Sequence, residues 1–291
     1  MPTDRTNDFL RALLVRQLTT WLPTALHRSR RATVALAGTD AGTAVAALQL
    51  VAAHADQLRG RQVTVLVLAD DAPDLPVRLG PVEAELPAEV TVHLLPGTPD
   101  RLPVAAKAAG AAGSPLFSFV ALPGAASREL LSAAANGRTG EVLLHAGAST
   151  RDALVAVGFP LVAELTPVLP DDEAIGVIAF GSRSDRSLEA VRDALWAVGA
   201  DLGVRYRDAS GATVEVTGDP DLEPLAGELL AELRRVGPRP VTELRRHTLT
   251  TTVYRAADAN RALADLLDAG EVRRDREAGR LAGDEVITPT R

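Results

Sequence analysis

Five apolar runs separated by segments with helical spacing constrain this chain more than any other feature of its sequence. The runs cover residues 32–38, 62–71, 89–97, 116–124 and 140–147. Each is continuously apolar instead of alternating with polar residues, which is typical of parallel strands covered on both faces. The sequence therefore predicts an α/β fold with a Rossmann-like, mostly parallel sheet. In such a sheet, ligands bind beyond the carboxyl ends of the strands, near the point where the strand order reverses.

Further elements are expected on either side of these runs. The spacing predicts a leading amphipathic helix over 9–26, a helix over 42–60, a strand over 174–184, a helix over 187–203 and a β-hairpin over 204–218.

The pattern changes near residue 220. Three helical segments are followed there by two short strand-like segments, which is the order of a winged helix-turn-helix. We therefore divide the chain into a Rossmann-like domain over 1–219 and a winged-helix domain over 220–291.

Composition limits the possible functions. The chain has no cysteine, so disulfides, thiolate metal sites and a cysteine nucleophile are excluded. The net charge of -7 argues against broad nucleic-acid binding. Arg11 and Arg16 interrupt the apolar positions near the beginning, and no run reaches the roughly 18 apolar residues of a membrane span. We expect a cytoplasmic protein without a membrane partner.

A candidate binding loop follows the first run at Gly38, Thr39, Asp40 and Gly42. A glycine lets a ligand approach the backbone, and the free N–H groups of the next helix favour a carboxylate or phosphate. In S-adenosylmethionine enzymes this loop wraps the methionine part. The alternative is ordinary turn chemistry, since "GTDAG" is not the G-x-G-x-x-G pattern of dinucleotide folds.

Two further loops would complete such a cofactor site. Asp70 or Asp71, after the second run, would accept hydrogen bonds from the ribose hydroxyls, and Gly97 would lie near the adenine. The alternative is that these aspartates are solvated residues at a strand end.

The whole chain resembles the three-Cys-motif partner (TcmP) family, whose members look like Rossmann-type methyltransferases with a C-terminal winged helix. The stretches that carry this resemblance are "GTAVAALQL", "SPLFSFVALPG…GEVLLHAG", "IAFGSRSDRSLEAVRDALWAVG" and "TLTTTVYRAADANRALADLLDAGEV". The last two are the most specific. The resemblance implies S-adenosylmethionine as the possible cofactor and a protein as a partner.

The chain departs from the family pattern at the positions where chemistry is expected. The family's first loop usually reads "DAFAGPG", whereas here its acidic position is Ala35 and the loop is shortened. The family's "DPFG" at the fourth strand is "ALPG", so the expected acid is Ala121. Alanine offers no side-chain hydrogen bond to a cofactor or to an accepting nitrogen. Asp40 could substitute in the first loop, although it is displaced along the chain.

Other candidate residues have two interpretations each. The five histidines have no metal-binding spacing, and none is expected to bind a metal. His145 ends the fifth run and would either face the cleft or bond locally. Arg183 and Arg186 could bind an anion at a helix N-terminus, or Ser184 or Asp185 could simply cap that helix.

The C-terminal segment is electrically neutral. Residues 222–291 contain twelve arginines and twelve acidic residues, and the third helical segment carries several aspartates. A helix that reads DNA is usually more basic, so we expect no nucleic-acid partner. "VRRDREAGR" over 272–280 could still touch phosphate as a wing.

These observations lead to three hypotheses, and whether the protein is an enzyme stays open among them. The first is a catalytically degenerate, methyltransferase-like protein that acts as a binding or partner protein. The alternatives are an active S-adenosylmethionine-dependent methyltransferase, with Asp40, Asp70 and His145 in altered roles, and a winged-helix DNA-binding regulator.

Overall fold

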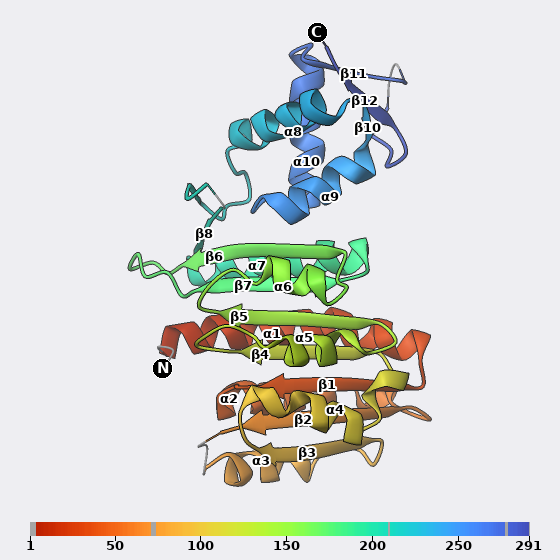
Figure 1. Cartoon of the computed structure of the whole chain (residues 1–291), viewed down its shortest axis with the longest axis vertical. Helices are drawn as coiled ribbons and strands as arrows, with labels where there is room; N and C mark the ends of the chain where they lie inside the picture. The colour runs from red at the N-terminus through yellow and green to blue at the C-terminus, as the bar shows by residue number, and fades with distance from the viewer. Residues whose placement is uncertain (1–3, 71–73, 209, 277–278, 291) are drawn as a thin grey trace.

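The structure, a computed structural model, describes residues 4–70, 74–208, 210–276 and 279–290. Nine strands form one sheet in the order β3-β2-β1-β4-β5-β7-β6-β8-β9, and three form a second, in the order β10-β12-β11 (Figure 1). The large-sheet strands are β1 (Arg31–Ala37), β2 (Gln62–Ala69), β3 (Val90–Pro96), β4 (Leu116–Ala121), β5 (Gly140–Ala146), β6 (Leu161–Val168), β7 (Val177–Ser182), β8 (Arg205–Arg207) and β9 (Thr213–Val214). The small-sheet strands are β10 (Arg239–Pro240), β11 (Val272–Arg274) and β12 (Val286–Pro289).

The helices connect and cover these strands. The α-helices are α1 (Asp4–Arg28), α2 (Ala41–Ala53), α3 (Leu75–Glu83), α4 (Leu102–Ala108), α5 (Arg128–Ala135), α6 (Arg151–Ala156), α7 (Asp185–Leu202), α8 (Glu223–Val236), α9 (Val241–Thr251) and α10 (Ala256–Asp268). Three short 3₁₀ turns are η1 (Ala55–Gln57), η2 (Pro99–Arg101) and η3 (Ala111–Gly113).

The five predicted runs are the five parallel strands of the large sheet. Strands β3, β2, β1, β4 and β5 pair in parallel, and β1 is buried along all but its first residue. Strand β7 is antiparallel to both β5 and β6, so β6 again has the direction of the first five strands. The chain is therefore α/β, with a large, mostly parallel sheet that is compatible with a Rossmann-like fold.

Some predicted boundaries are wrong. The helix expected over 42–60 ends earlier, because the backbone leaves the α-conformation at His54 and continues as η1. The second run stops being a strand at Ala69, two residues before its predicted end. Strand β6 was not predicted at all. Its sequence "LVAELTPV" contains Glu164 and Pro167, which interrupt the apolar pattern.

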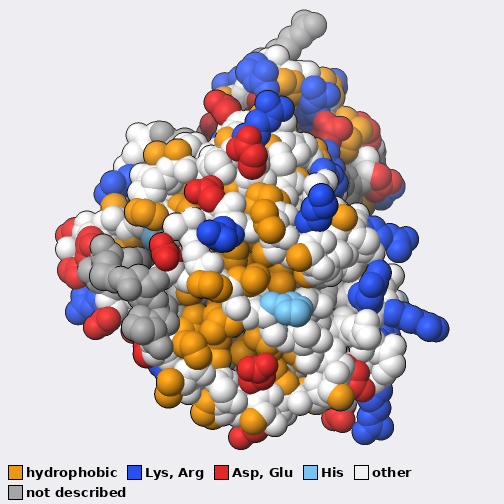
Figure 2. All heavy atoms as spheres, turned by 60° about the horizontal axis from the view of Figure 1, so that its bottom comes forward, with side chains coloured by type: hydrophobic (Ala, Val, Ile, Leu, Met, Phe, Trp, Pro, Cys, Tyr) orange, Lys and Arg blue, Asp and Glu red, His pale blue; other side chains and the backbone are white. Residues whose placement is uncertain are grey.

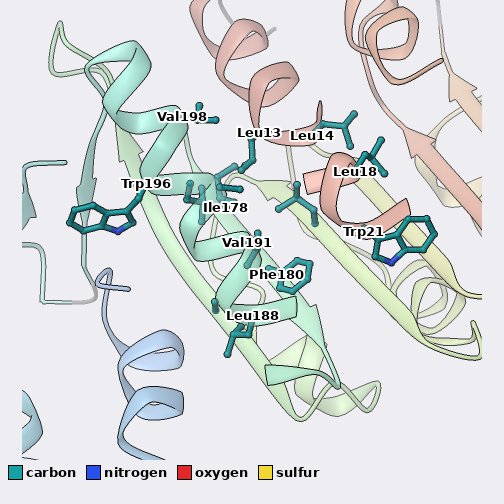
Figure 3. Packing of buried hydrophobic residues seen from close by; sticks show 14 of the residues in the cluster. Leu13, Leu14, Leu18, Trp21, Ile178, Phe180, Leu188, Val191, Trp196 and Val198 are labelled. Carbon is teal, nitrogen blue, oxygen red and sulfur yellow. The ribbon is translucent and has the colours of Figure 1, made fainter. Parts of the chain in front are cut away.

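Helices cover the large sheet on both faces. Helices α1, α2, α3 and α7 form one layer, and α4, α5 and α6 form the other (Figure 1). The first layer buries most of the apolar core, which includes Leu13, Leu14 and Leu18 of α1, Ile178 and Phe180 of β7, and Leu188 and Val191 of α7. Figure 3 shows Leu13 on the side of α1 that faces α7. Burying each of these side chains stabilises the fold by about 1.5–3 kcal/mol.

The C-terminal unit contains α8, α9, α10 and the small antiparallel sheet, and it is joined to the sheet domain through α7. The guanidinium of Arg192, whose side chain is only 1% exposed, donates hydrogen bonds to the carbonyls of Leu249 (2.8 Å), Thr252 (2.9 Å) and Val253 (3.3 Å). The indole of Trp196 donates to the same Val253 carbonyl (2.8 Å). Burial lowers the pKa of Arg192 to about 10, so this side chain stays charged at neutral pH. Buried hydrogen bonds therefore fix α9 against α7.

None of the helices in the described part of the chain combines the length and the apolar character needed to cross a bilayer.

Candidate functional site

The predicted binding residues gather at the carboxyl ends of β1, β2 and β3. The strand order reverses between β1 and β4, which is where an open α/β sheet binds ligands. The Gly38 N–H donates to the Leu68 carbonyl (3.0 Å), and the Gly97 N–H donates to the Ala69 carbonyl (3.0 Å). These bonds bring the three loops to one edge of the sheet.

Gly38 allows a close approach by the chain itself. Its φ is +72°, a left-handed conformation, and a Cβ placed on it would overlap the carbonyl oxygen of Ala121. The same Cβ would lie 3.1 Å from Cγ of Pro99. Two neighbouring segments thus occupy the side of Gly38 on which a side chain would project, while Gly38 itself is exposed.

Asp40 caps helix α2. Its carboxylate accepts hydrogen bonds from the backbone N–H of Thr43 (3.0 Å) and from the Thr43 hydroxyl. An anion at a helix N-terminus is favourable, and here the protein supplies that anion itself. Arg11 of α1 lies over Gly42, and its Nη2 would be 3.3 Å from a Cβ placed on this glycine. The side chain of Thr39 is buried.

The residues predicted to contact ribose and adenine follow strands β2 and β3. Asp70 is exposed just beyond the end of β2, and Asp71 lies outside the described residues. Gly97 has a φ of +128°, and the Cδ and Nε of Arg101 would lie 2.7 and 2.8 Å from a Cβ at this position. The Arg101 side chain therefore covers Gly97 on the side where a side chain would project.

The two alanines that replace family acids lie in different surroundings. Ala35 is completely buried in β1, within the apolar cluster under α4 and α5. Ala121 lies at the end of β4, where its carbonyl meets Gly38. An acid at position 35 would be buried among apolar side chains, which is costly without a hydrogen-bonding partner.

His145 bonds locally. Its Nε2 lies 2.5 Å from the carbonyl oxygen of Ile175, and Gly176 leaves room for the ring with a φ of +91°. The backbone carbonyl can only accept, so Nε2–H is the donor. This geometry agrees with the structural interpretation of His145 and leaves the acceptor role to its Nδ1.

Ser184 caps the N-terminus of α7, which is one of the two interpretations of this segment given above. Ser184 accepts a hydrogen bond from the Ser187 N–H (3.2 Å), and the helix begins at Asp185. The Cζ of Arg183 lies over the Phe159 ring, 5.6 Å from the ring centroid. Asp185 accepts two hydrogen bonds of 2.7 Å from Arg246, and these bonds hold the pKa of its carboxyl below the usual range.

The sequence interpretation missed a second polar site, between α1, the start of β5 and the start of α7. Glu141 is 7% exposed and Gln17 is 1% exposed, and both line a cavity of about 340 Å³. The signal was present: Gln17 interrupts the apolar face of the leading helix, and Glu141 interrupts an apolar run. Apolar residues surround both positions, so the pattern predicts a helix and a strand there and no polar site.

A third hollow lies in the C-terminal unit, between α10 and the β11–β12 hairpin. Its volume is about 630 Å³, and its lining includes Arg273, Arg274, Arg276 and Arg280 together with Asp268. Arg274 forms a buried ion pair with Glu285 (2.6 Å), and Arg276 pairs with Asp284 (3.4 Å).

No protein-family model matches the chain, and no curated protein matches it either.

Proposed function

We propose that this chain is a methyltransferase-like protein of the three-Cys-motif partner type that no longer transfers methyl groups and acts by binding a protein. The observation that carries the proposal is the lack of free acids at this edge of the sheet: Ala35 and Ala121 stand where acids are expected, and Asp40 is engaged as the cap of α2. The order β3-β2-β1-β4-β5-β7-β6, with β7 reversed, supports a methyltransferase-like sheet because Rossmann-like methyltransferases have this arrangement.

The chain's own groups take up the interactions that a cofactor would make. The carboxylate of Asp40 occupies the N-terminus of α2, where the methionine carboxylate would be held. Arg101 covers Gly97, where adenine would stack. Neither Ala35 nor Ala121 can accept a hydrogen bond through its side chain.

Exposed apolar side chains support a protein partner. Val77 of α3 is 77% exposed, Val104 of α4 is 73% exposed, and Leu94 of β3 is 37% exposed. All three lie toward the end of the large sheet that β3 forms, with Val77 and Val104 in opposite helical layers, and Figure 2 shows hydrophobic side chains gathered at this end of the molecule. Exposed apolar patches mark interaction sites.

Calorimetry with S-adenosylmethionine and S-adenosylhomocysteine tests whether the chain has lost the ability to bind the cofactor. We expect any dissociation constant to be weaker than about 1 mM, which corresponds to less than about 4 kcal/mol of binding free energy. Micromolar binding that Asp70→Ala abolishes would instead support the active methyltransferase, with Asp40, Asp70 and His145 in altered roles. Lys107→Ala, away from the three loops, is the control for nonspecific effects.

Comparative affinity capture tests the protein-binding role. We expect Val77→Asp combined with Val104→Asp to lose a specific protein that the unmodified chain retains, while stability changes by less than about 0.5 kcal/mol because both side chains are exposed. Val155→Asp is the matched control, since Val155 is 54% exposed on α6. Equal capture by all three proteins would reject the β3 face as the binding surface.

A winged-helix DNA-binding regulator is the second candidate. The order α8, β10, α9, α10, β11, β12 with a β10-β12-β11 sheet supports a winged helix, and the arginine-lined hollow beside α10 favours phosphate contact. If Arg273 and Arg280 contact phosphates, replacing both by alanine will weaken binding to double-stranded DNA. The slope of log affinity against log salt concentration will also become less steep by about 2. Fluorescence anisotropy at physiological salt measures this, and no binding by the unmodified protein rejects the candidate.

A further inference from the structure

The cavity beside Glu141 lies at the opposite edge of the sheet from the carboxyl ends of the parallel strands. Parallel strand β5 begins there, antiparallel strand β7 ends there, and α7 begins there. Residues of α1 close the cavity on one side, and its volume of about 340 Å³ is sufficient for a small metabolite.

Two buried acceptors in this cavity have no donor among the described residues. One oxygen of Glu141, Oε1, accepts a hydrogen bond of 2.6 Å from the Ser187 hydroxyl. The other oxygen, Oε2, and the amide oxygen of Gln17 are buried without a partner. Buried polar atoms are nearly always paired, so each unpaired acceptor points to a missing donor.

The surroundings of these acceptors favour a positively charged donor. Burial raises the pKa of Glu141 above its usual value, although hydrogen bonds from Ser187 and Ser182 and the charge of Arg28 oppose that shift. Trp21, which is 6% exposed, also lines the cavity and offers an aromatic ring. A carboxylate, an amide oxygen and an indole ring are groups that stabilise an ammonium ion.

The rim of the same cavity favours an anion. Helix α7 is 18 residues long, and its N-terminus opens onto the cavity at Ser184 and Ser187. The exposed side chains of Arg28 and Arg186 line the cavity as well, whereas the guanidinium of Arg183 is directed to Phe159 and to the carbonyl of Ala135. Asp185 does not cancel this charge, because Arg246 holds its carboxylate. A helix N-terminus beside arginines attracts a carboxylate.

We infer that this cavity is a binding site for a free amino acid, with its ammonium group on Glu141 and Gln17 and its carboxylate between the start of α7 and Arg186. An amine without an acid would be repelled by the guanidinium groups of Arg28 and Arg186. An acid without an amine would leave Glu141 and Gln17 unpaired. Only a zwitterion satisfies both halves of the site, and the inference does not depend on the proposed loss of methyl transfer.

Thermal-shift and calorimetric titrations with the free proteinogenic amino acids, each at about 10 mM, test this inference through ligand linkage. We expect at least one to raise the melting temperature and bind measurably. The methyl ester and the deaminated acid of that compound should each bind at least about tenfold more weakly, since each loses one charged group.

Two variants locate the binding. Glu141→Gln preserves shape but removes the charge, and it should weaken binding by about tenfold or more. Glu189→Gln, which lies on α7 but outside the cavity lining, should bind as the unmodified protein does. Circular dichroism shows whether each variant is folded, and Arg186→Gln, an exposed substitution, gives an independent loss of affinity if Glu141→Gln fails to fold. The inference is overturned if no amino acid binds the unmodified protein, if Glu141→Gln and Arg186→Gln bind normally, or if the deaminated acid binds equally well.

Discussion

Replacing Gly38 with alanine is expected to destabilise the protein by about 3 kcal/mol or more. Two effects add at this position. A residue with a Cβ is strained at a φ of +72°, and the Cβ would overlap the Ala121 carbonyl oxygen. That oxygen belongs to backbone at the end of β4 and cannot move without shifting the strand. Urea unfolding followed by circular dichroism measures the loss.

Gly60 is the matched control for this prediction. Its φ is +71°, almost the same as that of Gly38, but a Cβ there would have nothing within 4 Å. Gly60→Ala should therefore cost only the conformational strain, about 1–2 kcal/mol. An equal loss in the two variants would contradict the close approach of the Ala121 carbonyl to Gly38.

Arg192→Ala is expected to cost about 3–5 kcal/mol. The substitution leaves the carbonyls of Leu249, Thr252 and Val253 without their donor and creates a cavity at the interface of α7 and α9. These carbonyls lie at the C-terminal end of α9, where the helix dipole favours a positive charge. Chemical denaturation at neutral pH, where Arg192 is charged, measures the effect.

Arg16→Ala is the control for the loss of an arginine. Arg16 pairs with Asp201 at 2.9 Å, but both side chains are about half exposed, so its removal should cost less than about 1 kcal/mol. A loss of similar size in the Arg192 variant would show that the C-terminal unit is not fixed through this buried guanidinium.

The parallel part of the sheet could be predicted from sequence because strands covered on both faces are continuously apolar. The run 32–38, for example, becomes a strand in which only Arg31 is exposed. The sequence does not predict strand β6, because its apolar residues are interrupted by Glu164, whose largely buried carboxylate accepts hydrogen bonds from Ser149 and Thr150. The position of β7 between β5 and β6 depends on pairing between distant segments, and no local pattern encodes it.

The candidate site could be predicted in part. Glycines and aspartates after apolar runs locate the carboxyl edge of a parallel sheet, and the three predicted loops do lie together there. The sequence could not show that Pro99 and Ala121 meet over Gly38, because those contacts arise from three separate loops. The meeting of Gln17 with Glu141 is of the same kind, since α1 and β5 are far apart in the chain.

The most direct test of the central claim is an amide-resolved NMR titration with S-adenosylhomocysteine. If the strand-end site no longer binds the cofactor, the amides of Gly38, Thr39, Asp70 and Gly97 will show no saturable change of chemical shift up to about 1 mM of the compound, the level set by the expected affinity. A saturable, concerted shift of these four amides at micromolar concentration would contradict the claim, because it would show a nucleoside bound across all three loops.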